Sequence, residues 1–153
     1  NTLNVSNYVA RYTGNANAGT GAMNVYGTFK PIGAGYYAPT MKNGSTIDFT
    51  EWKKDSALES RFPITATSKG NKIMKFEAGT VKIRISSDNK ELRSFARTLP
   101  NILTWTNECA DRNEETDFVL EDANGNPLKY YSLSADVDGL KLKYLGGMAI
   151  VIR

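Results

Sequence analysis

The sequence contains no histidine, and cysteine is represented by Cys109 alone. Without histidine, no Ser-His or Cys-His catalytic pair can be assembled. A single cysteine excludes an intramolecular disulfide and a structural zinc site built on cysteine and histidine ligands. Cys109 lies beside Glu108 and close to Asp111, whose negative charges disfavour a thiolate, so we expect the thiol to be unreactive.

Long apolar runs are also missing. The longest candidate, residues 145–152, is far shorter than the roughly 20 residues of a membrane-spanning helix, so we expect no membrane insertion. There is no Walker A loop, and the glycine-rich segment 14–21 lacks the dinucleotide-binding pattern. Asp136 and Asp138 supply too few oxygen ligands for a calcium loop. These absences predict a protein that is not an enzyme and carries no cofactor and no metal. A carboxylate-based enzyme is the third possibility.

The residues that are present favour a β-rich fold. A length of 153 residues fits one domain, which we expect to span 1–153. Short alternating apolar runs separated by turn residues predict an α+β, β-rich class with largely antiparallel sheets of about nine or ten strands. Long flexible loops are expected near 13–22 and 32–46, where glycine, asparagine and tyrosine are frequent. No internal repeat has a fixed period.

Two short helices are expected, at about 48–61 and 88–99. Asp48 with Glu51, and Asp88 with Glu91, have the spacing of a capping box. A proline ends each segment, at Pro63 and Pro100. In the second segment, apolar residues recur at helical spacing and predict one face packed on a core.

A basic β-hairpin is the clearest local prediction. Strand periodicity on both sides of Ala78-Gly79 indicates a turn there, which places Lys75 opposite Lys82 on the polar face. Like charges opposed on a sheet are unfavourable, so an anionic neighbour would stabilise them. Three interpretations are open: a solvated strand face, an acidic protein partner, or nucleic acid. The candidate binding residues of this basic region are Lys75, Lys82, Arg84, Arg93 and Arg97.

Charge is unevenly distributed along the chain. Residues 69–97 carry eight basic and three acidic residues, a balance of +5, whereas residues 108–122 have a balance of −6. Such bipolarity suits head-to-tail self-association as well as an anionic ligand. The acidic candidates for an interface are Glu114, Glu115 and Asp117. Tyr36 and Tyr37, in a glycine-rich segment, are candidates for stacking on bases or for insertion into a neighbouring subunit.

These features favour a structural or assembly protein, such as a component of a virion, a tail or a surface filament. In this hypothesis Lys75, Lys82 and Arg84 pair with the acidic segment of a neighbouring copy or of another structural protein. The apolar run 148–152 is expected to be a buried strand, or an edge strand that pairs with another chain. The alternative is a single-stranded nucleic-acid-binding protein that uses the basic hairpin and the tyrosine segment. A virion or extracellular surface is the favoured location.

Overall fold

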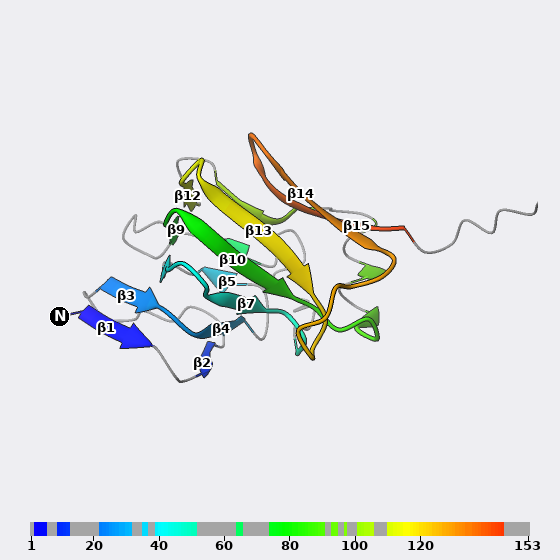
Figure 1. Ribbon diagram of the computed structural model, residues 1–153, viewed down its shortest axis with the longest axis horizontal. Coiled ribbons are helices and arrows are strands. Elements are labelled where there is room, and N and C mark those ends of the chain that lie inside the picture. The colour runs from blue at the N-terminus through cyan, green and yellow to red at the C-terminus, as the bar shows by residue number, and fades with distance from the viewer. Residues whose placement is uncertain are drawn as a thin grey trace, which may run out of the picture.

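The computed structural model describes residues 2–5, 9–12, 22–31, 35–36, 39–51, 64–65, 74–90, 93–94, 97, 101–105 and 110–145. The strands form three five-stranded sheets, named A, B and C here (Figure 1). Sheet A contains, in order, β1 (Thr2–Val5), β3 (Ala22–Val25), β6 (Thr40–Met41), β9 (Met74–Phe76) and β12 (Ala110–Arg112). Sheet B contains β2 (Val9–Tyr12), β4 (Thr28–Pro31), β7 (Thr46–Asp48), β10 (Gly79–Arg84) and β13 (Thr116–Glu121). Sheet C contains β5 (Gly35–Tyr36), β8 (Ile64–Thr65), β11 (Asn101–Thr104), β15 (Gly139–Tyr144) and β14 (Tyr131–Asp136).

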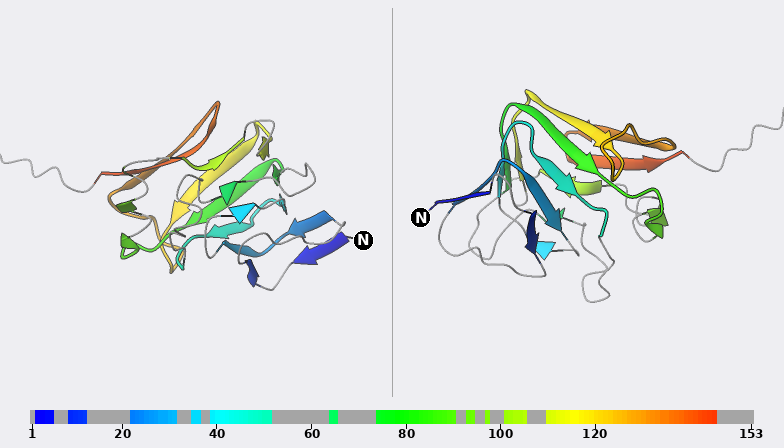
Figure 2. Two further views of the ribbon diagram at one scale, coloured as in Figure 1. Left: turned by 180° about the vertical axis from the view of Figure 1, so that it is seen from behind. Right: turned by 60° about the horizontal axis from the view of Figure 1, so that its bottom comes forward.

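The chain winds as a coil. Consecutive strands pass from sheet A to sheet B to sheet C and then return to sheet A, where each new strand pairs in parallel with the previous one. We call each turn a rung. The first rung holds β1 and β2, the second β3 to β5, and the fifth β12 and β13. In the two further views of Figure 2, the strands of sheets A and B remain side by side in this order.

The prediction of largely antiparallel sheets is therefore wrong. The described strands of sheets A and B pair with one another in parallel. Antiparallel pairing is found where β15 meets β14 and β11, and in an isolated bridge between Glu121 and Pro127. Alternation of apolar and polar residues indicates that a segment is a strand. It does not distinguish parallel from antiparallel pairing, because the alternation is the same in both. The partner of each strand lies one full rung away in the sequence, so local turn signals could not reveal it.

The basic hairpin is also corrected. β9 belongs to sheet A and β10 to sheet B, and residues Glu77 and Ala78 form the corner between them. Lys75 is aligned with Thr40 and Asp111 instead of Lys82. The opposition of two lysines does not occur, because the chain changes sheet at the position that resembles a hairpin turn.

The two predicted helices are not elements of the described fold. Asp48 ends strand β7 and the next residue, Phe49, is fully buried, so the segment 48–61 does not open as a helix. Residues 52–61 lie outside the described residues. Within 88–99 the isolated residues Lys90, Arg93, Ser94 and Arg97 have helical backbone, but the others that would complete a helix are not described. The first segment was misread because Asp48 accepts hydrogen bonds from Thr50 as a turn rather than as a helix cap.

The segment 32–46, expected to be a loop, contains β5 and β6 and the first residue of β7. The other expected loop, 13–22, ends at Ala22, the first residue of β3, and residues 13–21 lie outside the described residues, as does the run 148–152. The rungs also differ in length. Thr28 and Thr46 are aligned 18 residues apart, whereas Lys82 and Val119 are aligned 37 residues apart. Unequal rungs explain why the coil leaves no fixed-period repeat in the sequence.

The core consists of columns of side chains that stack from rung to rung. Phe29, Ile47 and Ile83 are aligned in sheet B and fully buried, and Leu120 continues this column. Val25, Met41 and Phe76 form the corresponding column in sheet A. A single rung cannot bury its apolar face, so stacking of neighbouring rungs supplies the core.

The corner between sheets A and B is held by backbone contacts across three rungs. Gly44 N donates to Thr80 O at 2.7 Å, and Thr80 N donates to Asn43 Oδ1 at 2.9 Å. Gly79 N donates to the carbonyl oxygen of Glu115 in the next rung at 3.1 Å. Gly79 has a φ of 109°, and a Cβ there would lie 2.4 Å from Asn43 Oδ1. The corner therefore requires glycine at position 79.

A polar turn follows the last strand of sheet B. Asp122 Oδ1 accepts hydrogen bonds from Asn124 N and Asn126 N, both at 2.8 Å. Gly125 has a φ of 83°, which permits the turn that Asn124-Gly125 indicates. The hydrogen bond from the Asn126 backbone, followed by that from Asn124, lowers the pKa of Asp122 below its ordinary value.

We expect this turn to make stability depend on acidic pH. Because the folded-state pKa of Asp122 is lowered, its contribution is present above the unfolded-state pKa and is lost as pH falls through the folded-state value. In Asp122→Asn, the free energy of unfolding should fall less steeply below about pH 4 than in the wild type. Urea unfolding from pH 7 to pH 2.5 measures this difference. Parallel pH profiles would show that the carboxylate is not stabilised by the turn.

Candidate functional site

The end of the coil at the fifth rung presents two strands with a free edge. β12 pairs with β9, and β13 pairs with β10. On the other side of β13 the described pairing is a single antiparallel bridge at its last residue, between Glu121 and Pro127. A free parallel edge leaves backbone N–H and C=O groups available for another strand. Sheet C differs, because β15 takes the fifth position and β14 lies one strand beyond it (Figure 1).

This end of the coil is acidic. We define the acidic rim as Asp111, Glu114, Glu115 and Asp117, which are all exposed. They lie on β12, on β13 and in the corner that joins them. No rim carboxylate forms an ion pair with a residue that the structure describes. Among the described residues, the rim therefore offers several carboxylates without an ion pair beside the edges of two strands.

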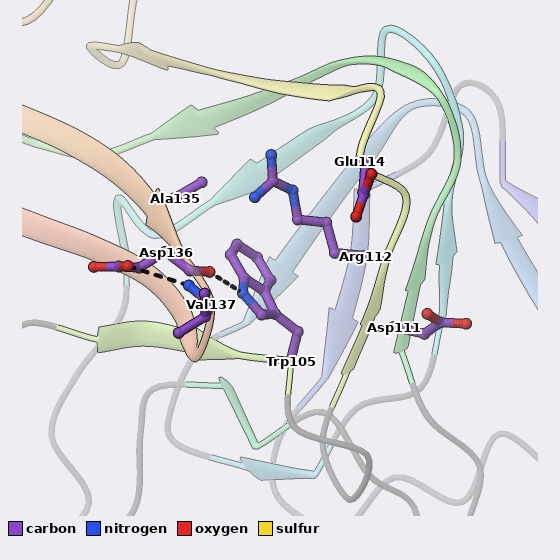
Figure 3. A pocket seen from close by; sticks show the side chains of 7 residues that line it. All are labelled: Trp105, Asp111, Arg112, Glu114, Ala135, Asp136 and Val137. Carbon is purple, nitrogen blue, oxygen red and sulfur yellow. Dashed lines mark hydrogen bonds between the residues drawn. The ribbon is translucent and has the colours of Figure 1, made fainter.

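An open hollow of about 520 Å³ lies between the rim and the tip of the β14–β15 hairpin (Figure 3). It is lined by Trp105, Asp111, Arg112, Glu114, Ala135, Asp136 and Val137. Trp105 anchors the hollow: its indole stacks on Phe118 with ring centroids 5.5 Å apart, and its Nε1 donates to Asp136 O at 2.5 Å. The indole thereby connects the fifth rung to the hairpin.

Arg112 places a positive charge and a buried hydrogen-bond donor without a described acceptor at this end of the coil. It is aligned with Phe76, so it occupies the last position of the apolar column of sheet A. Its guanidinium carbon lies 5.4 Å from the centre of the Trp105 ring, a cation–π contact (Figure 3). Its Nε is buried and has no hydrogen-bond partner among the described residues. A buried donor without an acceptor is costly, so an acceptor supplied at this end would be favourable.

The tip of the hairpin is fixed by an ion pair. Lys141 Nζ lies 2.9 Å from Asp136 Oδ2 and 3.3 Å from Asp138 Oδ1. The hydrogen bond from Lys141 lowers the pKa of Asp136, and the hydrogen bond to Asp136 raises the pKa of Lys141. These charges are neutralised within the hairpin, which distinguishes them from the acidic rim.

A ladder of alternating charge crosses sheet B. Lys30 Nζ lies 3.8 Å from Asp48 Oδ2, and Arg84 is aligned with both Asp48 and Glu121. Arg84 donates to Glu121 Oε1 through Nε at 2.8 Å and Nη2 at 2.5 Å. We call these four residues the charge ladder. Arg84 therefore has its acidic partner within the same chain.

Arg93 and Arg97 are brought together at another place, beside β15 in sheet C. Their guanidinium carbons lie 4.9 and 5.0 Å from the centre of the Tyr144 ring. Arg93 Nη2 also donates to Ser87 O, and a hydrogen bond to Tyr131 raises the pKa of Arg93. Arg97 is exposed and forms no ion pair with a described residue.

The other predicted binding residues are dispersed. Lys75 is exposed on sheet A, Lys82 is partly buried on sheet B, and Tyr36 belongs to β5 of sheet C. Tyr37 lies outside the described residues. The structure thus brings together Glu114, Glu115 and Asp117, and separately Arg93 and Arg97, but it does not collect the basic residues into one track.

The sequence reasoning missed Trp105 and Arg112 of the hollow, and Lys30, Asp48 and Glu121 of the charge ladder. Apart from Asp48, which has capping-box spacing with Glu51, none of them belongs to a local motif. Their neighbours come from other rungs, so only the register between strands could have identified them. Among the described residues, no cluster of three or more acidic or cysteine side chains could hold a metal ion. No helix in this part of the chain has the length and apolar character needed to cross a membrane.

The succession of rungs and the parallel columns define a parallel β-solenoid, whose described end at the fifth rung is charged. No family model matches the chain, and no match was found among curated proteins or among solved structures.

Proposed function

We propose that this protein is a structural component without catalytic function, and that copies of it assemble by stacking the first rung of one solenoid on the fifth rung of the next. The observation that supports this most strongly is the edge of β12 and of β13 up to Leu120, which pairs with no described strand and lies beside the acidic rim. Stacking of this kind joins two different surfaces, and such a contact repeats from copy to copy without closing.

The charge at the other end of the described coil is complementary. Residues 1–47, which include every described strand of the first two rungs, contain Arg11, Lys30 and Lys42 and no acidic residue. Residues 108–122 of the fifth rung have a balance of −6. The described strands of the first rung contribute the single positive charge of Arg11, since Lys30 pairs with Asp48 and Glu51, and Lys42 pairs with Glu77. One positive charge facing a negative fifth rung favours one orientation of association.

In this proposal the partner of the acidic rim is the first rung of another copy, and not the basic segment 69–97 that the sequence had suggested. Arg84 binds Glu121 of its own chain, and Lys75 is aligned with Asp111 in the adjacent rung. The segment 69–97 is therefore a neighbour of the acidic segment within one molecule. The first rung, at the opposite end, is the surface that remains to meet the acidic rim of another copy.

The proposal predicts that neutralising the rim weakens assembly. Glu114→Gln combined with Asp117→Asn should raise the dissociation constant on the order of tenfold at 0.05 M salt, because each exposed pair contributes about 0.2–1 kcal/mol. The difference should shrink at 1 M salt, where exposed charges are screened within about 3 Å. Light scattering over a concentration series measures both effects.

The control is Asp88→Asn, which removes one exposed carboxylate distant in the chain from the rim and is compared with Glu114→Gln alone. The control should assemble like the wild type. Equal weakening by the two variants would mean that net charge, rather than the acidic rim, controls the association. An unchanged dissociation constant in the rim variant would contradict the proposed interface.

Single-stranded nucleic acid is the alternative partner. The cluster of Arg93, Arg97 and Tyr144 combines guanidinium groups with an aromatic ring, a combination that suits phosphates and bases. Lys75, Lys82 and Tyr36, however, belong to three different sheets. The absorbance ratio at 260 and 280 nm, recorded with the light scattering, distinguishes the two partners.

A further inference from the structure

We infer that the hollow between the acidic rim and the β14–β15 hairpin binds a neutral carbohydrate, with Arg112 donating to its hydroxyl oxygens and Glu114 accepting from its hydroxyl groups. The hollow has a volume of about 520 Å³, which falls in the range of roughly 300–1,000 Å³ that is usual for small-molecule sites. The site lies within one copy of the chain. It therefore does not rest on the proposed stacking of copies.

Arg112 supplies a hydrogen-bond donor that the described part of the chain does not use. Its register with Phe76 places it in the inward column of sheet A, at the last described rung. Figure 3 shows the guanidinium extending from β12 toward the hairpin, above the indole of Trp105. Nε is buried without a described hydrogen-bond partner, which is a cost to the fold. A ligand with an acceptor oxygen would remove this cost.

Glu114 supplies the complementary acceptors. Its side chain is exposed in the corner between β12 and β13, and it lines the hollow. Its carboxylate forms no ion pair and no hydrogen bond with the residues that the structure describes. Hydroxyl groups form short, strong hydrogen bonds to an ionised carboxylate. The hollow thus offers one unused donor and one set of unused acceptors to the same ligand.

The charges that line the hollow favour an uncharged ligand. Asp111, Glu114 and Asp136 line it together with Arg112. An anion would accept from Arg112, but the carboxylates would repel it. A cation would be repelled by the guanidinium and would leave its buried Nε without an acceptor. A hydroxyl group donates one hydrogen bond and accepts two, so it satisfies both partners without a net charge. Sugars carry such groups on neighbouring carbons.

The tip of the hairpin adds an apolar contact that is already fixed in place. Val137 lines the hollow and is 94% exposed, and Ala135 beside it is exposed as well. The C–H groups of a sugar ring would cover these side chains. The hydrogen bond from Trp105 to the Asp136 carbonyl and the ion pair of Asp136 with Lys141 hold the tip. A site that is held before binding loses less conformational entropy when the ligand binds.

Titration with oligosaccharides, followed by NMR, tests the site. The neutral probes are short oligomers of glucose, galactose, mannose and N-acetylglucosamine. The charged probes are oligomers of galacturonic acid and of glucosamine. The protein is kept at 1 M salt, which weakens association through exposed charges but screens short contacts inside the hollow much less. We expect a neutral oligomer to bind with a dissociation constant on the order of 1 mM and to shift the indole N–H signal of Trp105 and the amide signal of Val137.

Two variants test the assigned partners. Arg112→Met should weaken binding about tenfold. It should leave the midpoint of urea unfolding at or above that of the wild type, because it removes a buried donor without an acceptor and places a methionine sulfur near Trp105. A purely structural role of Arg112 would lower the midpoint and leave binding unchanged. Glu114→Gln should weaken binding about fivefold. The matched control is Asp117→Asn, which removes a rim carboxylate outside the lining of the hollow and should keep the affinity.

Three results would overturn the carbohydrate site. The first is the absence of any shift at Trp105 with every neutral oligomer up to about 20 mM. The second is tighter binding of a charged oligomer than of every neutral one. The third is equal weakening by Glu114→Gln and Asp117→Asn, which would place the sugar elsewhere. If Arg112→Met does not fold, the comparison of Glu114→Gln with Asp117→Asn decides alone. Stacking is measured separately by mass, so its failure leaves this site standing.

Discussion

Gly79→Ala should lower the free energy of unfolding by about 2–5 kcal/mol. An alanine at a φ of 109° has a strained backbone, which costs roughly 1–2 kcal/mol. Its Cβ would also lie 2.4 Å from Asn43 Oδ1, and the crowding adds roughly 1–3 kcal/mol. Asn43 cannot move away freely, because its Oδ1 accepts the hydrogen bond from Thr80 N. Urea unfolding at pH 7 measures the change.

Gly44→Ala is the control for this effect. Gly44 has a φ of 80°, but a Cβ there would meet no atom within 4 Å. Only the backbone strain remains, so the expected loss is about 1 kcal/mol. Similar losses at the two positions would show that Asn43 does not hold the corner against the next rung.

Arg84→Met should destabilise the protein by about 2–4 kcal/mol, and Glu121→Gln by about 1 kcal/mol. The two side chains form one ion pair but differ in exposure, at 26% for Arg84 and 8% for Glu121. Removing Arg84 leaves a nearly buried carboxylate without its cation, the more costly situation. Removing the charge of Glu121 leaves Arg84 partly solvated and still aligned with Asp48. Urea unfolding of the two variants gives the difference.

The double variant, Arg84→Met with Glu121→Gln, completes the thermodynamic cycle. We expect it to be less destabilised than the sum of the two single variants, because the unpaired carboxylate is no longer present. Equal losses in the single variants, with no coupling between them, would contradict the role of the charge ladder in joining the fourth and fifth rungs.

Several strands were predictable from the sequence, but β5 and β6 lie in an expected loop, and the pairing of the strands was not predictable. Met74, Phe76, Val81 and Ile83 alternate with polar residues and do lie on strands with their side chains buried. The same alternation fits a hairpin and a corner of a solenoid equally well. What decides between them is the contact of Gly79 with Asn43 and Glu115, which come from the preceding and following rungs. Such contacts span about 36 residues and have no local signal.

The candidate site was only partly predictable, because the charge of a segment can be read from the sequence whereas contacts between rungs cannot. An acidic segment at 108–122 is visible in the sequence, and Glu114, Glu115 and Asp117 do lie together on the acidic rim. Arg84, by contrast, was assigned to a neighbouring molecule, although Glu121 of its own chain is one rung away. Arg112 gave no signal at all, since its position at the end of an apolar column depends on the register with Phe76.

The most direct test of end-to-end stacking is the mass of the wild-type protein, measured by size-exclusion chromatography with multi-angle light scattering at 0.05 M and 1 M salt. We expect a mass that rises with concentration through multiples of the 16.9 kDa chain, is smaller at high salt, and has the absorbance ratio of protein alone. A monomer at every concentration would contradict the account. So would a particle carrying material that absorbs at 260 nm and is removed by salt, which would favour nucleic acid instead.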